Sequence, residues 1–148
     1  MKSAKLGAWF VIAVATAVLP QTGTSNDKPT ESGHRKGSHG LEGWTLNWPD
    51  PDNPGVQLPI TLVVARDGKI LRRIDGEGMV WDWIFWADGK QVAYESGPKH
   101  FSLDCVLFDL NKRREVARVD CFHDLPANAP AWAKALEGVG GGSGEAKQ

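Results

Sequence analysis

The dipeptide Asp-Gly between short runs of β-branched and aromatic residues most constrains the fold of this chain. Asp67-Gly68 separates residues 60–66 from residues 69–74, and two more Asp-Gly dipeptides follow further along. Aspartate followed by glycine readily adopts the positive φ angles of a tight hairpin turn. The four prolines between residues 41 and 59 exclude a helix there, because proline lacks the backbone N–H that a helix interior requires. The sequence therefore predicts antiparallel hairpins.

The rest of the chain continues this pattern of short strands and turns. Residues 79–86 are apolar on both faces, which predicts a strand at the centre of its sheet, buried on both sides. The elements expected after it are a turn at Asp88-Gly89, strands over 90–95, 102–110 and 115–122 with a basic turn at 111–114, and a short helix over 131–136. The fold class is therefore mainly β. We expect an antiparallel meander of about six strands with a short C-terminal helix, in a single β-rich domain over 41–138.

Residues 84–109 combine an aromatic residue, a turn and two strands in an order that resembles the repeat of TolB-type periplasmic β-propellers. The matching positions are Phe85 for the aromatic residue, residues 86–90 for the turn, Val92, Ala93 and Tyr94 for the second strand, and residues 107–110 for the third. The resemblance implies one blade over residues 79–122 and, in the hairpin 60–74, part of a second. A propeller needs at least four blades, so the resemblance implies a free-standing blade-like sheet. It implies no catalytic residue, because the matching motif is a structural turn.

The N-terminus has the three parts of a secretory signal peptide. Lys2 and Lys5 precede the uncharged, apolar residues 6–19, and small residues at alternate positions lead to Pro20. A helix that spans a bilayer takes about 20 residues, so this run is short for a membrane anchor, which is the alternative. We therefore expect a signal peptide over 1–25 and a secreted or periplasmic protein, with no membrane contact after cleavage.

Two polar segments flank the expected domain. Residues 26–40 contain almost no apolar side chains and cannot offset the entropy lost on ordering, so we expect a disordered linker. Residues 139–148 are rich in glycine, and we expect a flexible tail.

The two cysteines of the chain, Cys105 and Cys121, lie on strands that we expect to form one hairpin. If residue 111 pairs with residue 115, the two cysteines face each other directly across that hairpin. In an oxidising compartment such a pair forms a disulfide, which is the pairing we expect. Two alternatives stay open. One is a pair of free thiols, and the other is a metal or catalytic site that uses Cys121 and His123 together with Cys105 or Asp124.

Charge and motifs exclude several classes of function. Without Lys2 and Lys5, which belong to the signal peptide, the 17 basic side chains fall to 15 against 18 acidic ones. A nucleic-acid partner would require clustered positive charge, so we expect none. The sequence has neither a phosphate-binding glycine loop nor a nucleophile elbow, and it indicates no cofactor and no metal.

Two classes of function remain. The sequence favours an exported, non-catalytic binding or interaction module with an unknown protein or saccharide partner. Trp44 and Trp48, in the proline-rich segment, are the candidates for its binding surface, and self-association through sheet edges is a further expectation. The alternative is a small exported hydrolase that uses His100 or His123 with a nearby aspartate. The sequence assigns no catalytic residue and does not decide whether the protein is an enzyme.

Overall fold

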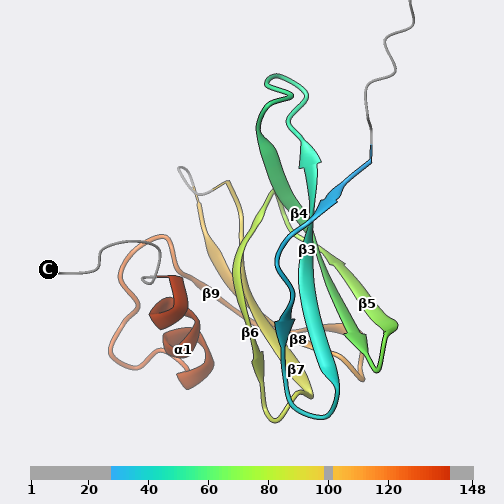
Figure 1. The fold of residues 1–148 in the computed structure, drawn as a ribbon. Coiled ribbons are helices and arrows are strands. Elements are labelled where there is room, and N and C mark those ends of the chain that lie inside the picture. The colour runs from blue at the N-terminus through green and yellow to red at the C-terminus, as the bar shows by residue number, and fades with distance from the viewer. Residues whose placement is uncertain (1–27, 99–101, 141–148) are drawn as a thin grey trace, which may run out of the picture.

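The computed structural model describes residues 28–98 and 102–140, and this part of the chain holds two antiparallel sheets and one helix (Figure 1). The first sheet has the order β1-β3-β4-β5, with β2 also paired to β3, and the second has the order β6-β7-β8-β9. The elements are β1 (Thr30–Glu31), β2 (Arg35–Lys36), β3 (Leu41–Pro49), β4 (Gln57–Arg66), β5 (Lys69–Asp75), β6 (Val80–Trp86), β7 (Gln91–Ser96), β8 (Asp104–Asp109), β9 (Arg114–Asp120) and α1 (Ala131–Gly140). The prediction of a mainly β fold with a short C-terminal helix is confirmed.

The predicted turns are present, and the first has the backbone that its sequence requires. Asp67 and Gly68 have φ angles of 50° and 76°, and Arg66 pairs with Lys69 across them. Positive φ at both central residues matches the right-handed twist of the flanking strands. The turns between β6 and β7 and between β8 and β9 also lie where the sequence predicted them.

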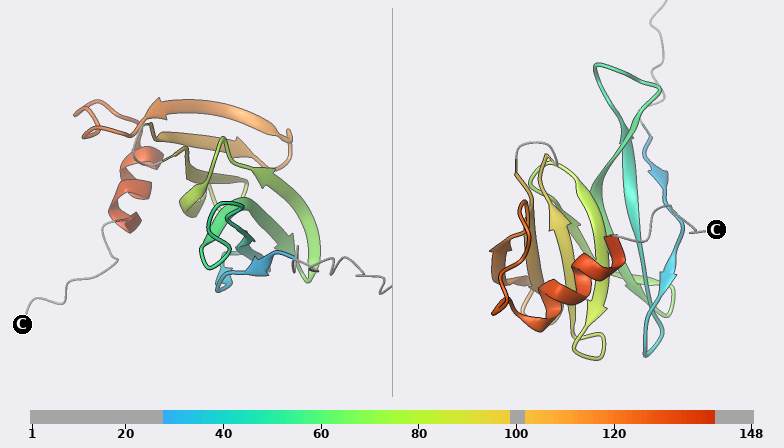
Figure 2. Two further views of the ribbon diagram at one scale, coloured as in Figure 1. Left: turned by 90° about the horizontal axis from the view of Figure 1, so that it is seen from above. Right: turned by 90° about the vertical axis from the view of Figure 1, so that its left-hand side faces the viewer.

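The two sheets form layers around one core, and α1 covers the outer face of the second sheet (Figure 2). The buried residues of the central core come from both sheets: Leu41, Leu62, Val64, Ile74, Val80, Trp83, Val92, Tyr94, Val106 and Leu110. On the other face of the second sheet, Trp132 and Leu136 of α1 pack near Cys105 and Leu107. Each large apolar side chain that leaves water in this way stabilises the fold by about 1.5–3 kcal/mol.

Two glycines bring the N-terminal part of the first sheet close to the aromatic residues of β6. A Cβ atom at Gly43 would lie 2.6 Å from the Trp83 ring, and one at Gly37 would overlap the Phe85 ring. Any larger residue at these positions would push the backbone away from β6. Glycine is therefore required for the close approach of β2 and β3 to this strand.

The structure corrects the expectation of a disordered linker over residues 26–40. Within its described part, Thr30–Glu31 and Arg35–Lys36 both pair with β3. The segment buries little apolar surface, but its polar groups are satisfied by strand pairing and by side chains. Ser32 N donates to Thr45 O at 2.9 Å, and Ser32 Oγ accepts from Thr45 N at 2.8 Å. The segment has few apolar residues to bury, and hydrogen bonds to β3 order it instead.

The strand β6 lies at an edge of its sheet, so the predicted central position of residues 79–86 is wrong. Both faces of β6 are nevertheless covered, because none of its residues is exposed. The cover comes from α1 and from the first sheet, which both contact β6. Its apolar run reflects packing between layers and does not require a strand partner on each side.

Each of the edge strands β5, β6 and β9 carries a β-bulge opposite its neighbour. The registers shift between Val64 and Ala65 of β4, between Val80 and Trp83 of β6, and between Leu107 and Phe108 of β8. Bulges twist an edge and leave a residue unpaired, which opposes edge-to-edge association. The expected self-association through sheet edges remains a prediction, and this geometry works against it.

Several expectations concern residues that the structure does not describe. The signal peptide over 1–25, His100 and the tail beyond Gly140 lie outside the described residues, while α1 extends to Gly140, past the expected boundary at 138. Among the described residues, no helix has the length and apolar composition of a membrane-spanning segment.

Candidate functional site

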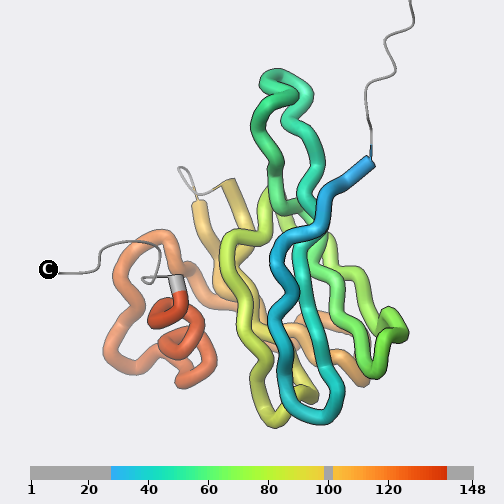
Figure 3. Tube along the Cα trace, in the orientation of Figure 1, coloured from blue at the N-terminus to red at the C-terminus, as the bar shows by residue number. Residues whose placement is uncertain are grey.

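At the seam between the sheets, the N-terminal segment runs between β3 and β6 (Figure 3). A polar hollow at this seam is lined by residues of the segment and of both sheets. Its volume is about 520 Å³, which is within the usual range for small-ligand sites. We call it the seam groove. Its walls are formed by Ser32, Gly33 and Arg35 of the N-terminal segment, Thr45 and Asn47 of β3, Gln57 and Pro59 of β4, and Val80, Trp81 and Trp83 of β6.

Arg35 connects the two sheets at this seam. Its Nη1 donates to Asp82 Oδ1 at 2.6 Å and to Trp83 O at 2.7 Å, and its guanidinium carbon lies 5.0 Å from the Trp83 ring centroid. The Asp82 carboxylate also accepts from Trp83 N at 2.7 Å. The Asp82 side chain is 14% exposed and the Arg35 side chain 48%, so water screens this ion pair in part. The pair occupies both backbone polar groups of Trp83 and anchors the N-terminal segment.

The groove presents hydrogen-bond donors that have no protein acceptor. Thr45 Oγ1 donates to Asn47 Oδ1 at 2.9 Å, which orients the Asn47 carboxamide. Within the described part of the chain, the NH₂ groups of Asn47 and Gln57 and the Nη2 group of Arg35 donate to no other residue. No wall residue is a carboxylate. The groove therefore favours a ligand rich in hydrogen-bond acceptors.

Two indoles form the aromatic part of the wall. Trp83 is 3% exposed and belongs to the central core, whereas Trp81 is half-buried. Trp81 Nε1 donates to Gly97 O at 2.7 Å, which fixes the ring in the β6 bulge. An indole held in this way offers apolar area at little cost in side-chain entropy.

The two tryptophans predicted as a binding surface have different environments. Trp48 is 38% exposed and remains a candidate. Trp44 is only 8% exposed, so its expected surface position is wrong. The His34 ring stacks on Trp44 at a centroid distance of 4.2 Å, and Trp44 packs with Val63 on the outer face of the first sheet. The segment that was expected to be disordered therefore supplies part of the cover over Trp44.

The predicted disulfide between Cys105 and Cys121 is present, with a Cα–Cα distance of 5.6 Å. The predicted register is wrong, because Cys105 lies opposite Val119 and not opposite Cys121. Two residues along a strand return to the same face, so the cysteines still meet diagonally. Both thiols are consumed in the bridge, which removes the alternatives of free thiols and of a metal site at Cys121 and His123.

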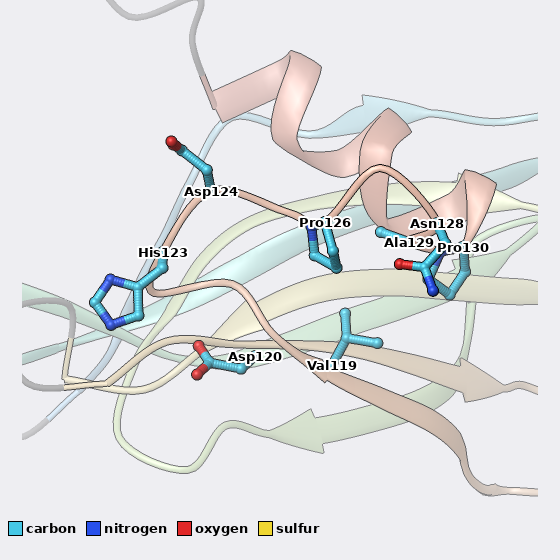
Figure 4. Close-up of a pocket in the computed structure, with 8 residues that line it drawn as sticks. All are labelled: Val119, Asp120, His123, Asp124, Pro126, Asn128, Ala129 and Pro130. Atoms are coloured by element: carbon cyan, nitrogen blue, oxygen red, sulfur yellow. The ribbon is translucent and has the colours of Figure 1, made fainter.

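A second hollow, of about 510 Å³, lies between the end of β9 and the loop that leads to α1 (Figure 4). Its lining includes His123, Asp120 and Asp124, the residue types that a hydrolase would use. The His123 ring and the Asp124 carboxylate point to different sides, and all three residues are exposed (Figure 4). Among the described residues, neither carboxylate lies within ion-pair distance of His123, and Asp120 Oδ1 accepts from Phe122 N at 2.8 Å. This arrangement does not form a general acid–base pair.

The densest group of charges lies on the second sheet and involves no groove residue. Arg118 forms ion pairs with Glu77, Asp104 and Glu115 at 2.7–2.9 Å. The hydrogen bonds that Arg118 donates to these carboxylates raise the pKa of Arg118 above its ordinary value, and Arg118 lowers the pKa of Glu115. The mutual satisfaction of these charges is typical of a structural network. No cluster of three metal-ligating side chains occurs in the described ranges.

Sequence reasoning did not identify the seam groove. Arg35 and Gly33 lie in the segment expected to be disordered, and Asn47 and Gln57 are single polar residues without a motif. The only available signal was the tryptophan content of residues 79–86, which was attributed to the core.

The fold and its groove define a class: a disulfide-bonded, mainly β protein of two layered sheets with a polar site at their seam. Compared with models of protein families, with curated proteins and with solved structures, the chain matches none of them. The resemblance of residues 79–122 to a TolB-type repeat stays a prediction.

Proposed function

We propose that this protein is an exported, non-catalytic binding module that takes a protein or saccharide ligand in the seam groove. The observation that carries the proposal is the set of unpaired donors on Arg35, Asn47 and Gln57 around one hollow. Asn47 is half-buried and Arg35 and Gln57 are exposed, so the acceptor groups of a ligand can replace water at these donors. A preformed hollow with a few convergent polar groups is the usual form of a binding site.

Export is supported by the signal-like N-terminus and by the disulfide. A bridge between Cys105 and Cys121 persists in an oxidising compartment and is rare in a reducing one. We therefore place the mature protein outside the cytoplasm, as a secreted or periplasmic protein.

The hydrolase alternative has less support. His123 and two aspartates share one hollow, but they are exposed and do not contact one another. Catalysis by a general base requires a positioned proton acceptor, and the geometry at His123 does not supply one.

Gly33 offers a direct test of the groove, because a Cβ atom added there meets no atom within 4 Å. The variant Gly33→Tyr should fold normally and fill the groove. Gly138→Tyr is the matched control, since Gly138 also has open space around it and lies on α1, outside the groove wall. We would apply fluorescently labelled mature protein to arrays of oligosaccharides and peptides. Ligands of the wild type should be retained by Gly138→Tyr and lost by Gly33→Tyr. Equal binding by both variants, or no ligand on either array, would contradict the proposal.

A further inference from the structure

We infer that the ligand of the seam groove is an oligosaccharide that carries a carboxylate, such as one with uronic acid residues. This inference rests on the binding function proposed above and names the class of ligand. Three features of the groove support it: the sign of its polar groups, the closed edge of β6 beside it, and the indole in its wall.

The polar groups of the groove are unbalanced in favour of donors. The wall holds a guanidinium and two carboxamides, no carboxylate, and hydroxyls that are already engaged with the backbone or with Asn47. Lys36, next to Arg35, lines a neighbouring hollow of about 390 Å³. Arg35 Nη1 is engaged with Asp82 and Trp83 O, which leaves Nη2 to donate to an acceptor of the ligand. A hydrogen bond from a guanidinium to a carboxylate is charge-assisted and stronger than a neutral one. A ligand with a carboxylate and further acceptor oxygens satisfies this set.

An extended peptide is the other ligand that a site beside an edge strand suggests. Such a peptide would add to β6 through backbone hydrogen bonds. At the middle of β6, however, Trp83 O already accepts from Arg35 and Trp83 N already donates to Asp82. The bulge between Val80 and Trp83 further disrupts the ladder at this point. The edge is therefore closed to a strand where it borders the groove.

The indole of Trp81 provides an apolar wall beside these donors. The half-buried ring is fixed by its hydrogen bond to Gly97 O, and the carboxamides of Asn47 and Gln57 lie on the other strands of the same hollow. A pyranose ring presents both kinds of surface: a face of C–H groups and a rim of oxygens. The combination of a rigid indole with planar hydrogen-bonding groups suits a sugar ring better than it suits an apolar side chain.

The test uses two matched pairs of trisaccharides as probes: trigalacturonate with galactotriose, and trimannuronate with mannotriose. The members of each pair differ in a carboxylate in place of a hydroxymethyl group. Titration calorimetry at low salt should show binding of at least one acidic trisaccharide, with its neutral counterpart weaker by about tenfold or more.

Two near-isosteric variants test the position of the ligand. Gln57→Glu and Asn47→Asp each replace a donor by a negative charge, and each should weaken acidic binding by tenfold or more. Asn128→Asp makes the same change in the second hollow and should leave binding unchanged. Thermal unfolding of each variant, without ligand, shows whether the fold is kept.

The outcomes separate this inference from the function on which it rests. If a neutral trisaccharide binds as tightly as its acidic counterpart, and Gln57→Glu weakens the binding of neither, the inference that the ligand carries a carboxylate is wrong. If no trisaccharide binds but a peptide binds and is lost in Gly33→Tyr, the saccharide class is wrong and the binding function stands. If neither a trisaccharide nor a peptide binds in the groove, the inferred ligand and the proposed binding function are both wrong.

Discussion

Removal of the Cys105–Cys121 disulfide should cost a large fraction of the stability of this fold. The bridge joins residues with a sequence separation of 16. In the chain-entropy model, a closed loop of that size stabilises the folded state by about 3 kcal/mol, because it restricts the unfolded chain. Small domains are stable by only about 5–15 kcal/mol in total. The double variant Cys105→Ala/Cys121→Ala should lose this amount and slightly more, since Cys105 is 1% exposed and packs near Trp132.

Urea unfolding, followed by tryptophan fluorescence with and without a phosphine reductant, measures the effect. Reduction of the wild type should lower the free energy of unfolding by about 3 kcal/mol. It should also raise the urea m-value, because the unfolded chain without a cross-link exposes more surface. The double alanine variant is the control, and reductant should not change its unfolding curve. The oxidised wild type should have a mass two hydrogens below that of the reduced form.

Two results would refute this reasoning. A loss of less than 1 kcal/mol on reduction would mean that the bridge does not restrict the unfolded chain as the model assumes. Free alkylation of both thiols in the unreduced, folded protein would mean that the bridge is absent.

Three further predictions test the packing, the core and the N-terminal segment. Gly43→Val should destabilise the fold by about 1–3 kcal/mol in urea unfolding, because its side chain overlaps Trp83, and wild-type stability would contradict the close approach of β3 to β6. Tyr94 is the sole tyrosine, and burial in the core, with a smaller effect of the Glu115 charge, raises its pKa from 10.0 to about 12. Since the folded state favours the neutral phenol, this contribution to stability is complete below pH 10. The free energy of unfolding should fall by about 2–3 kcal/mol as the pH rises from 10 to 12. Ultraviolet titration that shows phenolate near pH 10 in the folded protein would refute this prediction. Arg35→Leu should speed hydrogen exchange in β1 and β2 and leave β7 and β8 unchanged, and unaltered exchange would show that the Asp82 contact does not anchor the segment.

The parts of the fold that depend on local chemistry were predictable from the sequence. The turn at Asp67-Gly68 needs positive φ at two successive residues, and that requirement is met by the dipeptide alone. The helix after Pro130 is similarly local, since proline is favoured at the start of a helix. The side that each strand presents to the core follows from alternation, which is why the shared face of Cys105 and Cys121 was predicted correctly.

Register and layering depend on features that leave no signature in a single sequence. The bulge opposite Leu107 and Phe108 leaves Val116 of β9 without a partner and places Cys105 opposite Val119. The β8–β9 turn also uses Arg113 at a φ of 58°, where the sequence offers no glycine to mark a positive angle. The residue types within the hairpin mark neither the bulge nor the positive φ angle.

The N-terminal segment shows why the candidate site itself escaped prediction. A composition rule compares apolar burial with the entropy of ordering, and by that measure residues 26–40 should not fold. The rule omits the neighbouring edge strands, whose unpaired backbone groups gain from any segment that satisfies them. Here β3 and β6 provide such edges, and Arg35 satisfies the carbonyl of Trp83 while it neutralises Asp82. The ordered segment then supplies one wall of the seam groove. A polar segment next to the edges of two sheets is thus ordered by the same hydrogen bonds that create the site.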